Sequence, residues 1–277
     1  MRLLAETGDD AKILAGGQSL MPMLNLRLAH PELIIDINAA DDRQPSVAGG
    51  MLRLPALTRH RVLLEHDLVR RHCPLLAAAV WHVGNVRVRN RGTIGGSLAH
   101  ADPTSEIGCC ALATGAQVVV RGPRGDRTVP ASELFAGYWS TTLASAEIIT
   151  DVLIPAARPH QGWSFHEMVR RTSDFAIVAV AVTVDLAERT GDPAAARVAL
   201  AGVADRVVLA GPQLLTAIRT RAPPGSRTPW TQPMTCTRPA RTGAGWPGCS
   251  PSARSARPAP ARRDIARDST PDHAGRE

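Results

Sequence analysis

Two pairs of adjacent glycines are the residues of this sequence whose type and spacing most directly indicate chemistry. Gly16 and Gly17 lie in the stretch LAGGQSL, and Gly95 and Gly96 lie in RNRGTIGGSLA. Glycine permits positive φ angles and leaves no Cβ between the backbone N–H groups and an approaching ligand. Phosphate binds to such N–H groups, most readily where the stretch opens a helix, as AGGQS precedes LMPMLNL. Each pair therefore indicates an anion-binding loop.

The residues around the glycines bear on whether these are binding loops or ordinary turns. Either pair on its own is more typical of a tight turn than of a ligand site. Two pairs in one chain, with the hydroxyl groups of Thr93 and Ser97 beside the second pair, favour two loops that hold a pyrophosphate between them. The sequence has no Walker lysine motif and no GxGxxG after its first strand. The pattern therefore differs from the P-loop and Rossmann schemes.

Three further groups of side chains have both a chemical and a structural interpretation. His100 stands near Asp102 in LAHADP, as a base beside a carboxylate would, but it is more typical of a residue that shapes the turn. Cys109 and Cys110 fall on an apolar helix face and indicate core packing. The pair at 170–171, RR, is more typical of a solvated strand end than of a binding site.

Composition and charge exclude several classes of function. The chain of 277 residues carries a formal net charge of +7, but no Asp or Glu occurs from Arg206 to Arg263, so the excess belongs to a basic tail. A folded basic face for nucleic acid is therefore not expected. The five cysteines show no CxxC spacing for zinc or an iron–sulfur cluster. With no long apolar run or signal sequence, a reduced, cytoplasmic protein without a membrane span is expected.

Hydrophobic patterning predicts the elements that position the glycines. The first part predicts a helix ending at Gly8, a strand over 11–14, the first glycine loop, a helix over 20–28 and a strand over 33–37. The next part predicts a strand over 51–57, one or two helices over 58–83, the second glycine loop, and a helix over 104–115 capped by Thr104.

The remaining patterns predict mostly strands. A hairpin over 116–130 precedes a helix and loop over 131–143 and a strand over 147–155. Residues 156–162, with two prolines and a glycine, indicate a domain boundary. Three antiparallel strands are then expected over 163–171, 175–186 and 197–203. After about Arg206 no period is sustained, and the composition is that of a chain without a core.

The sequence segments around the glycines resemble those of a known family. LAGGQSLMPMLNLRLAHPELIIDI, HVGNVRVRNRGTIGGSLAHADPTSE, FAGYWSTTL with EIITDVLIP, and RRTSDFAIVAVAV occur in family order over roughly residues 1–204. They resemble the FAD-binding medium subunit of molybdenum hydroxylases, the carbon monoxide dehydrogenase and xanthine dehydrogenase family. The resemblance implies an α+β fold: a two-subdomain FAD-binding domain of the p-cresol methylhydroxylase type, then a smaller, incomplete antiparallel sheet-plus-helix domain.

The resemblance also implies positions for the cofactor. FAD would be contacted by the first loop, the second loop and four further positions: Leu14, Ala15, Gly16, Gly17, Gln18, Ser19, Leu20, Thr93, Ile94, Gly95, Gly96, Ser97, Asp102, Glu106, Ile149 and His166. Glu106 takes the family's acidic position, with Asp102 as the alternative. Ile149 would lie near the isoalloxazine ring, and His166 replaces a lysine of some relatives. Tyr138 is either near the flavin or a half-buried helix residue.

The function implied by the resemblance is electron transfer. The chain would take electrons from a [2Fe–2S] cluster on a small partner and pass them through FAD to an external acceptor. The molybdenum cofactor would lie on a large partner, the complex would be a dimer of heterotrimers, and no residue of this chain would be catalytic or bind a metal. Two rivals are a free-standing flavin oxidase and a scaffold remnant that no longer binds FAD.

The expected domains are 1–156 for FAD, 162–205 for the start of the second domain and 206–277 for an aberrant, disordered tail. Relatives continue after GVADR with helices, whereas this chain has MTCTRPARTGAGWPGCSPSARSAR. A neighbouring reading frame of GC-rich codons would encode a sequence very like the closing helix. A frameshift between residues 205 and 230, and a truncated N-terminus, are therefore expected.

Overall fold

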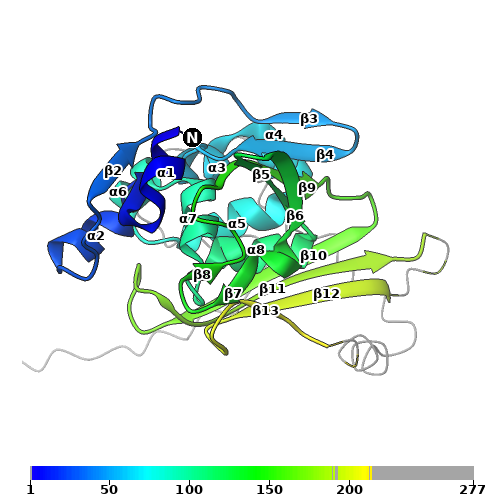
Figure 1. The fold of residues 1–277 in the computed structure, drawn as a ribbon. Coiled ribbons are helices and arrows are strands. Elements are labelled where there is room, and N and C mark those ends of the chain that lie inside the picture. Colours follow the sequence, from blue (N-terminus) through cyan, green and yellow to red (C-terminus); the bar gives the residue numbers. More distant parts are fainter. Residues whose placement is uncertain (1, 189, 191–192, 212, 214–277) are drawn as a thin grey trace, which may run out of the picture. The chain divides into compact units, whose positions relative to one another are not determined.

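The computed structural model describes residues 2–188, 190, 193–211 and 213, and Figure 1 shows their fold. All of them belong to the first of the two units into which the chain divides, residues 1–228. Of the expected tail over 206–277, residues 212 and 214–277 lie outside the described residues, and with them Cys236, Cys249 and most of the interval 205–230 in which the frameshift is expected.

The N-terminal segment forms a strand, loop, helix and strand, as predicted. Its elements are α1 (Arg2–Thr7), the 3-10 turn η1 (Gly8–Asp10), β1 (Ala11–Leu14), α2 (Leu20–Asn25) and β2 (Leu33–Asp36). Strands β1 and β2 pair in parallel. Helix α2 ends earlier than the predicted residue 28, because Arg27 adopts a left-handed φ of 55°.

A five-stranded antiparallel sheet forms the centre of the FAD-binding part expected from the sequence. Its strand order is β3-β4-β9-β5-β6, from β3 (Ser46–Ala48), β4 (Met51–Pro55), β5 (Gln117–Gly122), β6 (Gly125–Pro130) and β9 (Ile148–Pro155). Strands β5 and β6 form the predicted hairpin, with Gly122 opposite Gly125. Leu52, Leu54, Val118 and Val152 are buried in this sheet, so it has a well-defined core face.

Three helices occupy the stretch for which the sequence predicted one or two. They are α3 (His60–Glu65), α4 (Asp67–His72) and α5 (Pro74–His82). His66 interrupts the first run with an extended backbone, and its Nδ1 accepts a hydrogen bond from the Leu68 N–H at 3.2 Å. Pro74 opens α5 after Cys73, whose backbone is not helical, because proline suits the first helical turn and disfavours a helical residue before it.

The region predicted as the second glycine loop is helical, so that prediction is wrong. It contains α6 (Val86–Arg91) and α7 (Ile94–His100), followed by α8 (Glu106–Thr114). The alternation VRVR obscures α6, but the Asn85 side chain accepts hydrogen bonds from the Arg87 and Val88 N–H groups and caps it. Helix α8 is capped by Ser105 rather than Thr104, because the Ser105 hydroxyl accepts from the Gly108 N–H at 3.0 Å.

The predicted helix at 131 is short. Helix α9 (Ala131–Leu134) leads directly into a small hairpin of β7 (Phe135–Gly137) and β8 (Ser140–Thr141). Tyr138 and Trp139 form the turn of this hairpin and are 62% and 61% exposed. Tyr138 is therefore not a half-buried helix residue.

A second antiparallel sheet follows, as predicted. It consists of β10 (Gln161–Val169), β11 (Ala176–Leu186), β12 (Pro193–Ala201) and β13 (Val208–Leu209), paired in that order. Strand β13 was not predicted and extends regular structure past Arg206. Val207 beside it is buried, which anchors this last strand.

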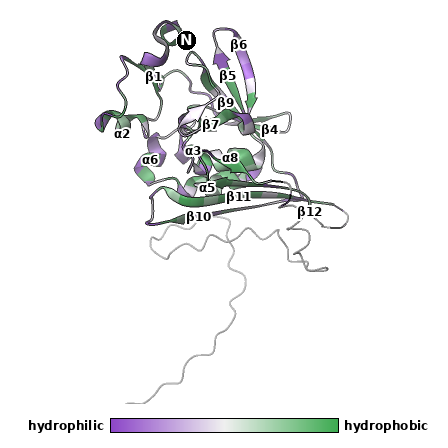
Figure 2. Ribbon diagram, turned by 60° about the horizontal axis from the view of Figure 1, so that its bottom comes forward, coloured by the Kyte–Doolittle hydropathy of each residue, from purple (hydrophilic) through white to green (hydrophobic). Residues whose placement is uncertain are grey.

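Helix α8 packs against the second sheet as well as the first part of the chain. Ala179, Ala181, Ala199 and Ala201 of the sheet are fully buried, and α8 contacts both β11 and β12. Figure 2 colours α5, α8 and β11 mostly as hydrophobic. Small side chains on the strands let the helix approach closely, so the two parts share one core. The mixed α and β architecture of two successive parts is confirmed.

Candidate functional site

The two glycine pairs lie against one another in the folded chain. A Cβ added to Gly16 would lie 2.3 Å from the Arg91 carbonyl oxygen and 2.8 Å from the Gly92 Cα. A Cβ on Gly96 would lie 3.8 Å from that of Ala15. Figures 1 and 2 both show α2 and α6, which flank these stretches, side by side. The predicted convergence of the two stretches is therefore present.

The first stretch has the features of an anion site. The backbone N–H groups of residues 16–19 donate no hydrogen bond within the described part of the chain. Gly17 has a φ of 72°, which turns the chain between β1 and α2, and the Gln18 side chain donates to the Gly16 carbonyl oxygen at 3.2 Å. Because buried or half-buried N–H groups require acceptors, this stretch fits a phosphate.

The second stretch differs, because its N–H groups are already bonded. Ile94 donates to the Thr58 carbonyl at 3.1 Å and Gly95 to the Ala56 carbonyl at 2.9 Å. The Gly96 and Ser97 N–H groups donate to the Thr93 hydroxyl and carbonyl oxygens. These bonds place the glycines in the first turn of α7, where they serve close packing. What remains for a ligand are the Thr93 and Ser97 hydroxyl groups, not a ring of N–H donors.

Close packing explains why glycine is required at position 95. A Cβ there would lie 2.6 Å from the Ala56 Cβ and 2.9 Å from its carbonyl oxygen. Both atoms belong to the segment after β4, whose backbone cannot move without breaking its bonds to Ile94 and to Thr150. The glycine therefore holds α7 against the five-stranded sheet.

Arg59 links the two stretches by hydrogen bonds, and no motif in the sequence indicated this role. Its Nη2 donates to the Asn38 side-chain oxygen at 2.7 Å, and its Nη1 donates to the Arg91 carbonyl oxygen. Asn38 follows β2 and is itself held by Asp36. One guanidinium thus links the end of β2, which pairs with β1, to the end of α6.

Two buried polar side chains lie behind the second stretch, and sequence reasoning missed both. The Thr58 hydroxyl and both ring nitrogens of His60 are buried without a hydrogen-bond partner in the described part of the chain. A Cβ on Gly92 would lie 2.7 Å from the His60 ring. Burial lowers the pKa of His60 to about 4; the Thr93 backbone opposes this shift, and the charges of Arg89 and Arg59 add to it. The imidazole is therefore neutral at pH 7.

The two acidic candidates have different environments. Asp102 accepts hydrogen bonds from the Thr104 N–H and hydroxyl at 2.8 and 2.7 Å, so its carboxylate shapes the turn before α8. Glu106 lies in the first turn of α8, one residue after Ser105, whose hydroxyl is 3.3 Å from that of Ser97. Burial raises the pKa of Glu106 to about 7, with further increases from Glu167 and Asp102.

Ile149 and His166 lie in different sheets. Ile149 is buried in β9 opposite Val120, and β9 packs against α7. His166 is exposed on β10 opposite Val180. Contact of these two residues with the cofactor stays a prediction.

The structural interpretations of the cysteine pair and of the arginine pair hold. Cys109 and Cys110 are buried in α8 and are free thiols, which confirms core packing. Arg170 and Arg171 are exposed just after β10. His100 is the last residue of α7 and is half-buried, and burial lowers its pKa against the opposing charge of Asp102.

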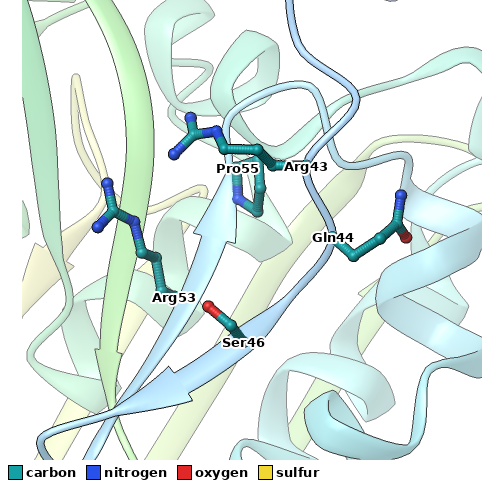
Figure 3. Close-up of a pocket in the computed structure, with 5 residues that line it drawn as sticks. All are labelled: Arg43, Gln44, Ser46, Arg53 and Pro55. Atoms are coloured by element: carbon teal, nitrogen blue, oxygen red, sulfur yellow. The ribbon is translucent and has the colours of Figure 1, made fainter.

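A pocket of about 370 Å³ lies away from these residues and contains none of the candidates. Figure 3 shows its lining side chains, Arg43, Gln44, Ser46, Arg53 and Pro55. Arg43 and Arg53 each donate to Asp151 at 2.8 Å, and Asp151 is buried in β9. Since both guanidinium groups already bind carboxylates, this hollow is a structural ion-pair network rather than an anion site.

Neither a metal centre nor a membrane-spanning helix is found among the residues that the structure describes. No group of three or more His, Cys, Asp or Glu side chains there is arranged to ligate a metal ion. No helix in the same ranges is long and apolar enough to cross a membrane.

Comparisons with known families match both parts of the chain. Residues 1–157 match the FAD binding domain in molybdopterin dehydrogenase. Residues 163–215 match the CO dehydrogenase flavoprotein C-terminal domain. The two matches follow one another in the order that the sequence resemblance implied.

Similar proteins are subunits of hydroxylases and dehydrogenases. The nicotine 6-hydroxylase medium subunit of Paenarthrobacter nicotinovorans is 40% identical over 206 residues, 74% of this chain and 71% of that protein. The carbon monoxide dehydrogenase medium chain of Hydrogenophaga pseudoflava is 39% identical over 183 residues, 66% and 64% of the two chains.

Solved structures show the same similarity. A carbon monoxide dehydrogenase from Hydrogenophaga pseudoflava that lacks the Mo-pyranopterin moiety superposes with a TM-score of 0.73 at 38% identity, over 75% of this chain and 72% of that one. Quinoline 2-oxidoreductase from Pseudomonas putida 86 gives 0.69 at 36% identity, with the same coverage.

Proposed function

Because the chain belongs to the family of FAD-binding medium subunits of molybdenum hydroxylases, we propose that it passes electrons from a [2Fe–2S] partner subunit through FAD to an external acceptor. The chain is a subunit of an oxidoreductase and carries an FAD-binding domain. Bound FAD supplies the electron-transfer chemistry. The chain's own residues bind and orient it.

The observation that carries the proposal is the first glycine stretch. Its N–H groups at residues 16–19 have no acceptor in the described chain, and the stretch packs against Arg91 and Gly92, directly before the second stretch. A pyrophosphate offers the acceptor oxygens that these donors require. The proposed contacts are the residues of the two stretches, 14–20 and 93–97, with Glu106 or its alternative Asp102, Ile149 and His166 as further contacts.

Some residues of the site are proposed to bind FAD, and others to hold those residues in position. The N–H groups of the first stretch bind the phosphates, and Arg91 and Gly92 limit how far that stretch can move. Arg59 holds the two stretches at a fixed separation through Asn38 and Arg91. Such preorganisation reduces the ordering cost of binding.

The partners belong to the same proposal. Similar proteins are named as medium, alpha or beta subunits of complexes, which supports an assembly with a large molybdenum-cofactor subunit and a small [2Fe–2S] subunit, as a dimer of heterotrimers. Substrate oxidation would then occur on the large partner. The free thiols of Cys73, Cys109 and Cys110 support a cytoplasmic location.

The test is binding of FAD by the purified full chain and by Gly16→Ala. We expect the wild type to show a flavin spectrum. We expect Gly16→Ala to bind FAD roughly 100-fold more weakly, because displacing the loop loses two charge-assisted hydrogen bonds of about 1.5 kcal/mol each. Titration monitored by flavin fluorescence measures the difference.

Gly137→Ala is the matched control. A Cβ there meets only Asp205 Oδ2, at an ordinary 3.4 Å, so FAD affinity should not change. A folded wild type that ignores added FAD would support a scaffold remnant instead. Substrate oxidation by the isolated chain, without the two partners, would support a free-standing oxidase.

A further inference from the structure

Arg59 has a half-buried guanidinium group with which no Asp or Glu of the described residues forms an ion pair. Its hydrogen bonds go to two neutral oxygens, the Asn38 side-chain oxygen and the Arg91 carbonyl oxygen. Neutral acceptors satisfy N–H groups but do not compensate a charge that has been taken out of water. Arginine also has more N–H donors than these bonds use. The guanidinium therefore keeps both charge and donors for an anion.

The guanidinium lies beside the first glycine stretch. Arg59 Nη1 donates to the Arg91 carbonyl oxygen, which is the same oxygen that a Cβ on Gly16 would approach to 2.3 Å. The backbone N–H groups of residues 16–19 have no acceptor within the described ranges. A cation and several N–H donors thus meet at one place. This combination of groups is typical of a phosphate site.

A series of hydrogen bonds fixes the guanidinium in this position. The Asp36 carboxylate accepts from the Asn38 backbone and side-chain N–H groups at 2.9 and 2.6 Å. Because a carboxylate only accepts, the Asn38 amide turns its oxygen toward Arg59 Nη2, at 2.7 Å. Asp36 ends β2 and pairs with Leu14, the last residue of β1. Arg59 is therefore held by the same two strands that position the first stretch.

The charges around Arg59 also favour an anion. Burial lowers the pKa of its guanidinium, and the positive charge of Arg91 lowers it further. Asp36 opposes this shift, but its carboxylate is hydrogen-bonded to Asn38 rather than to Arg59. An anion beside the guanidinium would offset both the burial and the repulsion.

We propose that the Arg59 guanidinium contacts the FAD pyrophosphate directly and supplies the positive charge that the N–H groups of the first stretch lack. This inference rests on the proposed function and names a further residue of its cofactor site. Hydrogen bonds from a guanidinium to phosphate are charge-assisted and stronger than those from neutral donors. The contact adds to the bonds by which Arg59 links the two stretches.

The test is calorimetric titration of the full chain with ADP, which contains the pyrophosphate and the adenosine of FAD. Lysine keeps the charge but loses the planar bonding, and glutamine loses both. We therefore expect Arg59→Lys to bind ADP roughly tenfold more weakly than the wild type, and Arg59→Gln roughly 100-fold more weakly. Equal losses in the two variants would overturn the proposal, because a residue that only links the stretches does not depend on charge.

Ionic strength reports the charge separately. Raising NaCl from about 0.05 to 0.5 M should weaken ADP binding by the wild type and Arg59→Lys at least about threefold more than binding by Arg59→Gln. The matched control is Arg61→Gln, which removes an exposed arginine paired with Glu65 and should behave as the wild type. A salt dependence as steep in Arg59→Gln as in the wild type would contradict a phosphate contact.

Adenosine, which has no phosphate, separates this contact from an effect on the fold. The Arg59 side chain does not cap α3, so its replacement leaves the start of that helix intact. We expect the same adenosine affinity in the wild type and all three variants. An adenosine affinity that falls as much as the ADP affinity would show that Arg59 acts on the fold and not on the phosphates.

The outcomes for the two proposals are distinguishable. A wild type that binds ADP with the expected dependence on Arg59, but acquires no flavin spectrum with FAD, would retain the phosphate contact and contradict the proposed function. Equal FAD affinities in the wild type and Arg59→Gln would contradict the contact alone. A folded wild type that binds neither ADP nor FAD would contradict both.

Discussion

His60 illustrates how one buried side chain limits the stability of this site. Its ring lies against Gly92 with both nitrogens unpartnered in the described chain. A neutral ring is tolerated there, but a charged one is not. The cost of this residue therefore depends on pH.

We predict that His60→Leu makes the chain less sensitive to acid. The folded pKa of about 4 lies below the ordinary 6.5, so the unfolded chain binds more protons between these values, and the wild type loses stability as the pH falls from 6.5 to 4. The loss is about 3 kcal/mol at most. Urea unfolding at several pH values should show it in the wild type and in the exposed control His30→Leu. Its persistence in His60→Leu would contradict the prediction.

At the scale of elements, the site depends on contacts between segments that are not paired in the same β-sheet. Strands β1 and β2 form their own two-stranded sheet, and α6 and α7 follow a different part of the chain. A two-stranded unit is weakly held on its own. Packing of Gly16 on Arg91 and Gly92, together with the hydrogen bonds of Arg59, holds it beside α7.

We predict that Arg59→Lys weakens FAD binding by roughly tenfold while the positive charge is retained. A lysine ammonium cannot reach Asn38 and the Arg91 carbonyl with the planar geometry of arginine, and loss of one charged hydrogen bond costs about 1.5 kcal/mol. Calorimetric titration with FAD measures the effect. Arg61→Lys, two residues further on and exposed, is the control. Equal FAD affinities in the two variants would show that the hydrogen bonds of Arg59 do not hold the two stretches in place.

At the scale of the whole described unit, α8 joins the two parts that the family comparisons separate. Thr183 of β11 is buried, and its hydroxyl donates to the Ala113 carbonyl oxygen in the last turn of α8 at 2.8 Å. The Gly202 N–H donates to the Pro103 carbonyl oxygen. These contacts indicate that both parts unfold together.

We predict that Thr183→Val lowers the free energy of unfolding by roughly 1 to 2 kcal/mol, because the isosteric valine leaves a buried carbonyl oxygen without its donor. Hydrogen exchange should show equal losses of protection in β9 and β11. The exposed Thr128→Val on β6 is the control and should leave both strands unchanged. A loss confined to β11 would mean that the two parts unfold independently.

The sequence by itself predicted most strands, the hairpin over 116–130 and the family. Periodicity and turn residues are local, and the strings around Gly16 and Gly95 are specific. It failed at α6 and α7, because the alternation VRVR and a glycine pair both conceal helices whose caps, Asn85 and Thr93, act through side-chain geometry.

Only the tertiary structure decided how the two glycine pairs differ. Within the described residues the N–H groups of the first pair have no acceptor, while those of Gly95 and Gly96 donate to the Ala56 carbonyl and the Thr93 hydroxyl, partners that the glycines themselves do not reveal. Arg59 and His60 likewise gain their roles from residues distant in the chain. The spacing of residues in the sequence indicates local conformation. Burial and hydrogen-bond partners, in contrast, are set only when distant segments pack together.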